Sequence, residues 1–271
     1  MFKGSIVAIV TPFNKGKFDE KAFCKLIEWH ISSGTNAIVP CGTTGESATL
    51  DYDEHYRVIE VAVRTVNKRV PVIAGTGANA TDETIMITKK AKKLGADAAL
   101  LVSPYYNKPT QEGLYRHYKA VAEAVNMPIV LYNVPGRTAV NILPPTVARL
   151  AEVKNIVAIK EATGDMKQVS EVIRLCGDRI AVVSGDDFTT LPLLALGGVG
   201  VISVTANIAP KEVSDMCRLW HERKHNEARK LHYKLEPLNT AMFIETNPIP
   251  AKTALAMMGK IKEEFRLPIC E

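Results

Sequence analysis

The chain has 271 residues, 46% of them hydrophobic and 23% charged, which suits one large buried core rather than a series of small modules. Its 34 Lys and Arg against 29 Asp and Glu give a net charge of +5, but the basic residues are scattered, which argues against a nucleic-acid-binding surface. Five widely separated cysteines and the absence of a signal peptide predict free thiols in the cytoplasm.

Apolar, β-rich runs recur along the chain at intervals of roughly 20 to 34 residues, the mark of a repeated supersecondary unit. They begin near Ser5, Ala37, Pro71, Ala98, Pro128, Ile156, Ile180 and Gly200. Segments with helical periodicity lie between them, at 19–33, 51–67, 81–94, 111–125 and 166–175, with Asp51, Thr81 and Thr110 as predicted N-caps. Because the runs are apolar throughout, both faces of each strand should be buried in a parallel sheet.

Residues 188–210 carry no charge and are long enough to cross a membrane. Pro192 and three glycines interrupt this segment, so we predict a helix, a turn, a strand and the start of another helix instead. From about Lys211 onward only helices are expected. Eight strand–helix units predict a (β/α)₈ barrel over residues 1–224, followed by a C-terminal helical region over residues 225–271.

Chemistry in such a barrel belongs to the C-terminal ends of the strands. Tyr132 and Lys160 end two neighbouring strands, which are about 4.8 Å apart in a sheet. A buried amine is disfavoured as the ammonium ion, and the free amine is a nucleophile that forms Schiff bases. The phenol beside it is a candidate for proton transfer. The alternative is a lysine whose amine simply reaches water at the strand end.

Two segments that follow strands carry candidate carboxylate holders, one after the second strand and one just after Tyr132. The turn Gly42-Thr43-Thr44-Gly45 can direct amides and hydroxyls at an anion, although it could also be no more than a tight turn. Arg137 can hold a second carboxylate through two hydrogen bonds, although taken alone an arginine here more often forms an ordinary salt bridge. Together with the amine and the phenol, these groups predict a pocket in which an oxo acid forms an imine and then an enamine.

Other chemistries are not expected. The segment from Gly75 to Ala80 matches the dinucleotide fingerprint, but Asp97 stands at the start of the next strand and not at its end, so we expect no nicotinamide. The six histidines lack the spacing of metal ligands, and a Gly-x-Ser-x-Gly motif is absent. We therefore expect neither a catalytic metal nor a serine nucleophile.

Six ordered motifs resemble the dihydrodipicolinate synthase (4-hydroxy-tetrahydrodipicolinate synthase) family of pyruvate-dependent Schiff-base aldolases, over essentially the whole chain. They lie at residues 42–46, 104–107, 132–138, 159–164, 184–187 and 200–204. Gly136-Arg137-Thr138 is similar to the synthase branch rather than to the sialic-acid lyase branch. The resemblance implies a lyase that condenses pyruvate with L-aspartate 4-semialdehyde, the entry step of diaminopimelate and L-lysine biosynthesis.

The resemblance also implies residue roles. Lys160 would carry pyruvate as a covalent imine, with no other cofactor, and Thr43 and Thr44 would hold the pyruvate carboxylate. Arg137 would hold the carboxylate of the aldehyde. Gly185 and Ile202 would line the site, and Tyr132, Thr44 and Tyr106 would form a proton relay. Because Tyr106 would enter from a neighbouring subunit, a homodimer or homotetramer is implied.

Many members of the family have a feedback site for L-lysine at the dimer interface. The matching positions here are Ser47, Ala48, His55, Asn79, Glu83 and Tyr105. Glu83 could meet a lysine ammonium, or it could be a solvated helix-surface carboxylate. Tyr52 stands where some feedback-sensitive members have histidine.

The resemblance leaves other possibilities open. The family continues past residues 266–268 into a further helix, so we expect this chain to be either naturally short or truncated. One rival function is a Schiff-base aldolase that acts on a sugar-derived 2-oxo acid, and it would have little use for Arg137. The other is a binding protein without turnover.

Overall fold

The computed structural model describes residues 2–270 and confirms the predicted barrel. Its strands are β1 (Gly4–Ala8), β4 (Ala37–Val39), β5 (Ile73–Gly75), β6 (Ala98–Val102), β7 (Ile129–Asn133), β8 (Ile156–Glu161), β9 (Ala181–Ser184) and β10 (Gly200–Ser203). They form one parallel sheet in the order β4-β1-β10-β9-β8-β7-β6-β5. A parallel bridge between Ile38 and Val72 joins the two edges and closes the barrel.

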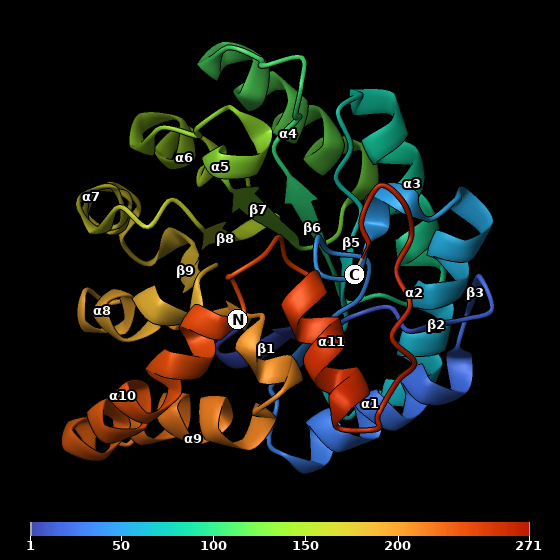
Figure 1. The fold of residues 1–271 in the computed structure, drawn as a ribbon. Coiled ribbons are helices and arrows are strands. Elements are labelled where there is room, and N and C mark those ends of the chain that lie inside the picture. The colour runs from blue at the N-terminus through green and yellow to red at the C-terminus, as the bar shows by residue number, and fades with distance from the viewer. Residues whose placement is uncertain (1, 271) are drawn as a thin grey trace.

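Helices surround the strands on the outside, as Figure 1 shows. They are α1 (Glu20–Ser32), α2 (Tyr52–Val66), α3 (Thr81–Lys93), α4 (Gln111–Val125), α5 (Pro135–Thr138), α6 (Pro144–Leu150), α7 (Met166–Cys176) and α8 (Thr190–Ala195). Asp51 and Thr110 cap α2 and α4 as predicted. The prediction for Thr81 is wrong: Ala80 is the N-cap of α3, and the Thr81 hydroxyl hydrogen-bonds Nδ1 of His117 at 3.0 Å instead.

Successive side chains along each strand point alternately into the barrel interior and toward the surrounding helices. On β8, Ala158 belongs to the interior cluster, whereas Ile159 packs against the helices. Lys160 therefore faces inward. Glu161 faces outward and accepts a hydrogen bond from Asn133 Nδ2 at 3.2 Å, so it is directed away from the amine.

Segment 188–210 folds as predicted, into α8, a turn, β10 and the start of α9 (Pro210–His221). Within residues 2–270, no helix has both the length and the apolar character needed to cross a membrane.

After α9 the chain forms α10 (His225–Ala241) and α11 (Ile249–Met257) and then runs without regular structure. The domain boundary at residue 224 stays a prediction. A short hairpin of β2 (Phe13–Asn14) and β3 (Lys17–Phe18) was not predicted.

Candidate active site

Lys160 and Tyr132 meet inside the mouth of the barrel. The register of β7 and β8 pairs the two residues directly, and Lys160 Nζ lies 4.1 Å from the centre of the Tyr132 ring. Lys160 is only 4% exposed and Tyr132 6%. The amine is thus buried among barrel side chains, which excludes the alternative of an amine that reaches water at the strand end. Its role as the nucleophile stays a prediction.

Two residues at the end of β9 shape the space around the amine. A Cβ on Gly185 would lie 3.1 Å from Lys160 Cε and 2.4 Å from Ala162 Cβ, so only glycine leaves room for the lysine side chain here. Asp186 follows it, and no role for this residue was predicted. Burial raises the pKa of the Asp186 carboxyl, the Lys160 amine opposes that rise, and Asp187 adds to it.

The turn after β4 contains two backbone amides that are available to a ligand. The amides of Gly45 and Glu46 donate to carbonyls of the same turn, at 3.0 and 3.1 Å, and Ser47 N donates to Gly42 O at 3.4 Å. Among the described residues, the amides of Thr43 and Thr44 have no such partner. Adjacent free amides form an anion-binding concavity, which favours the carboxylate-binding interpretation of this turn. We call residues 42–46 the anion turn.

Asn247, just before α11, connects the anion turn to Arg137. Its side-chain Nδ2 donates to Thr44 Oγ1 at 3.1 Å, and its backbone carbonyl accepts from Arg137 Nη2 at 3.1 Å. Arg137 is exposed on α5 and forms no ion pair within residues 2–270, so its guanidinium is available to a ligand. Sequence reasoning missed Asn247 because nothing in its local pattern indicates these contacts.

A cavity of about 550 Å³ opens beside these groups. Thr43, Arg137 and Asn247 line it, and so do most of the predicted effector residues: Ser47, Ala48, His55, Glu83 and Tyr105. Asn79 is not among the lining residues, but its carbonyl accepts from Asn107 Nδ2 at 2.9 Å. Tyr52 donates its hydroxyl to Glu83 Oε1 at 2.9 Å, and the role of Glu83 stays a prediction.

His55 lines both this cavity and a smaller hollow beside Tyr132. Its Nε2 lies 2.8 Å from the carbonyl of Gly75, and burial lowers the pKa of the imidazole. A small hollow of about 40 Å³ lies between His55 and Tyr132. The predicted effector residues and the barrel mouth are therefore near neighbours.

Tyr106 is not brought to the lysine by its own chain. It is 90% exposed and lies in the loop after β6 with a φ of 70°. Ile202, by contrast, is fully buried in the barrel interior with Tyr132. The roles predicted for Tyr106, Gly185 and Ile202 stay predictions.

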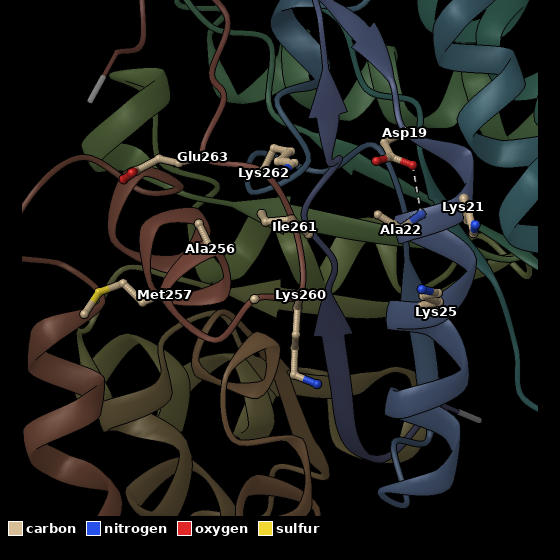
Figure 2. A pocket seen from close by; sticks show the side chains of 11 residues that line it. Asp19, Lys21, Ala22, Lys25, Ala256, Met257, Lys260, Ile261, Lys262 and Glu263 are labelled. Atoms are coloured by element: carbon tan, nitrogen blue, oxygen red, sulfur yellow. Dashed lines mark hydrogen bonds between the residues drawn. The ribbon is translucent and has the colours of Figure 1, made fainter.

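A larger hollow of about 670 Å³ lies elsewhere, between α1 and the segment after α11. Figure 2 shows Lys21 and Lys25 on α1 and Lys260 and Lys262 on that segment. It contains neither Lys160 nor Tyr132 and is an open surface groove. In the part of the chain that the structure describes, no cluster of three His, Cys, Asp or Glu residues could hold a metal ion.

The protein is a parallel eight-stranded barrel in which a buried lysine lies beside a tyrosine at the ends of neighbouring strands. This arrangement is typical of Schiff-base lyases of the class I aldolase type. Residues 1–271 match the model of the Dihydrodipicolinate synthetase family, and the chain belongs to that family. It is 76% identical to the 4-hydroxy-tetrahydrodipicolinate synthase of Thermodesulfovibrio yellowstonii, over 100% of this chain and 93% of the relative. The corresponding enzyme of Geotalea daltonii is 67% identical, over 99% and 93%.

Solved structures agree with this assignment. Dihydrodipicolinate synthase from Aquifex aeolicus superposes with a TM-score of 0.98 at 53% identity, covering 100% of this chain and 92% of the other. The chloride-inhibited enzyme of Acinetobacter baumannii, complexed with pyruvate, gives 0.98 at 55% identity, over 100% and 93%. A lysine-bound enzyme from Cyanidioschyzon merolae gives 0.96 at 42% identity, over 100% and 93%.

Proposed function

We propose that this chain condenses pyruvate with L-aspartate 4-semialdehyde to give 4-hydroxy-tetrahydrodipicolinate, with Lys160 as the Schiff-base nucleophile. The observation that carries the proposal is the buried Lys160 amine, which is paired in register with Tyr132. Membership of the Dihydrodipicolinate synthetase family supports the reaction, and the pyruvate complex of the Acinetobacter relative supports the first substrate. The product enters diaminopimelate and L-lysine biosynthesis in the cytoplasm.

The reaction follows from the groups at the barrel mouth. Lys160 Nζ attacks the keto carbon of pyruvate, water leaves, and an imine forms while the free amides of Thr43 and Thr44 hold the carboxylate. Loss of a methyl proton gives the enamine, whose carbon adds to the aldehyde. The substrate amine then attacks the imine carbon, closes the ring and expels the Lys160 amine unchanged. The covalent imine supplies the electron sink, so this cycle uses neither a metal nor a nicotinamide.

Proton transfer is assigned to Tyr132, Thr44 and Tyr106. Tyr132 touches the lysine side chain and can pass protons to and from the reacting atoms. Tyr106 stands 90% exposed on its own chain, which suits a residue that enters the site of a second copy. The active form is therefore a homodimer or homotetramer. Gly185 and Ile202 line the site beside the lysine.

Feedback inhibition by L-lysine is part of this proposal. Glu83 offers a carboxylate for an ammonium group, and five of the six predicted effector residues line the same cavity as Thr43 and Arg137. The lysine-bound relative from Cyanidioschyzon merolae supports the ligand class. Turnover should fall when millimolar L-lysine is added, and unchanged turnover would refute this part of the proposal.

The choice of aldehyde tests the function against its rival. We expect the purified chain to consume L-aspartate 4-semialdehyde with pyruvate and to leave sugar-derived aldehydes unchanged. Arg137→Ala should raise the KM for the semialdehyde about 10- to 100-fold, because a charge-assisted hydrogen-bond pair is lost, and should leave the KM for pyruvate nearly constant. Arg116→Ala, at an exposed arginine on α4, is the matched control. Preferential use of a sugar-derived aldehyde would favour the rival aldolase.

A further inference from the structure

Asn247 stands between two residues that are assigned to different substrates. It is 5% exposed and lies 203 residues from Thr44 and 110 from Arg137 in sequence. Its side chain hydrogen-bonds the first of them, through Nδ2 and Thr44 Oγ1 at 3.1 Å. Its backbone carbonyl hydrogen-bonds the second, through Arg137 Nη2 at 3.1 Å. A change of the Asn247 side chain therefore alters the Thr44 contact and leaves the group that binds Arg137 in place.

The direction of the Thr44 bond has a chemical consequence. A threonine hydroxyl has a single O–H proton and accepts hydrogen bonds on its lone pairs. Since the Asn247 amide donates to Thr44 Oγ1, it occupies a lone pair and leaves the Thr44 proton available to another acceptor. Thr44 itself is 2% exposed, so bulk water does not compete for that proton.

The oxygen of the Asn247 side-chain amide indicates that this side chain does more than fill space. Asn247 Oδ1 is buried and has no hydrogen-bond partner among the described residues. A buried acceptor without a partner lowers stability, and an apolar side chain of the same size would avoid that loss. An asparagine is thus poorly suited to a purely structural role at this position. Its side chain does, however, donate a hydrogen bond to Thr44, a residue of the proposed proton relay.

We infer that Asn247 is a positioning residue that fixes the direction of proton transfer through Thr44. Its amide holds the Thr44 hydroxyl as an acceptor on one side, so that the hydroxyl donates toward Tyr132 and the reacting atoms on the other. This inference rests on the proposed function, in which Thr44 belongs to the relay. It concerns the rate of proton transfer and not the binding of either substrate.

Two substitutions of similar size separate this role from a structural one. Asn247→Leu removes the donor, and we expect kcat to fall about tenfold while both KM values stay within about twofold. Asn247→Asp reverses the bond, because a carboxylate accepts the Thr44 proton, and kcat should fall about 100-fold. That second deficit should shrink as the pH falls through the titration of the introduced carboxyl, because the protonated acid again donates to Thr44. The Asn247→Leu deficit should not change with pH.

A double-mutant cycle provides the second measurement. If Asn247 acts through Thr44, adding Asn247→Leu to Thr44→Val should cause almost no further loss of kcat. Equal losses and equal pH profiles for the leucine and aspartate variants, additive losses with Thr44→Val, or a loss confined to the KM of the aldehyde would each overturn the inference. Trapping of pyruvate on Lys160 by borohydride should persist in every variant. If trapping fails in the unmodified chain, it is the proposed function that is wrong.

Discussion

Replacing Lys160 by alanine should reduce the condensation of pyruvate with L-aspartate 4-semialdehyde by at least about 10⁴-fold, because no imine can form without the amine. The remaining groups of the site would still bind both substrates but would have no covalent electron sink. Steady-state turnover of the two purified proteins measures the ratio directly. Lys160→Arg should be equally inactive, because it keeps the positive charge but lacks a nucleophilic amine.

Lys167→Ala is the matched control for this loss. Lys167 is exposed in the first turn of α7, on the element that follows β8, so its removal should leave turnover near that of the unmodified chain. The Lys160→Ala protein should remain folded, because the substitution removes an amine and leaves the apolar barrel interior intact. Turnover above a few per cent in a folded Lys160→Ala protein would refute the Schiff-base mechanism.

A second large effect is expected from a buried ion pair that supports the anion turn. Lys252 on α11 lies 2.5 Å from Glu46 Oε1, and both side chains are fully buried. The other oxygen of Glu46 accepts from the Arg266 amide at 3.1 Å, and Lys252 Nζ lies 4.3 Å from the centre of the Phe13 ring. Burial lowers the pKa of the Lys252 amine, while Glu46 opposes that change. The C-terminal region thereby holds the last residue of the anion turn.

Lys252→Met should lower the free energy of unfolding by about 3–5 kcal/mol, because it leaves the buried Glu46 carboxylate without the ammonium group that it pairs with. Urea unfolding measures the loss. Adding Glu46→Gln should restore much of the stability, because the uncompensated charge is then gone. The KM for pyruvate should rise in the single variant, since Glu46 is only two residues from Thr44.

Lys230→Met, at an exposed position on α10, is the control for this series. It should leave both stability and the KM for pyruvate unchanged. An unfolding free energy for Lys252→Met within about 1 kcal/mol of the unmodified chain would show that the pair does not stabilise the fold. If the double variant with Glu46→Gln is less stable than Lys252→Met alone, the unpaired Glu46 charge is not the cause of the lost stability.

The barrel and its central pair could be predicted because they depend on local periodicity. Strands that are apolar throughout indicate a parallel sheet, and residues at the same end of neighbouring strands must meet, which placed Tyr132 beside Lys160. The same alternation turns Glu161 outward, where it accepts a hydrogen bond from Asn133. These relations need only the register of adjacent strands.

The residues that contact the anion turn from the C-terminal region could not be predicted in the same way. Asn247 and Lys252 reach the anion turn from more than 200 residues away, and the packing of the C-terminal region decides which of its polar side chains turn inward. Asp186 could have been suspected, since it follows β9 at the catalytic end of the barrel. Tyr106 is exposed on its own chain, and its entry into the site of a second copy stays a proposal.

The most direct test of the central claim is mass spectrometry of the protein after borohydride reduction with pyruvate. We predict that the unmodified chain gains the mass of one reduced pyruvyl group and that peptide mapping places it on Lys160. The Lys160→Ala protein should gain none. An adduct on another lysine, or an unmodified chain that turns over substrate without forming an adduct, would contradict the account.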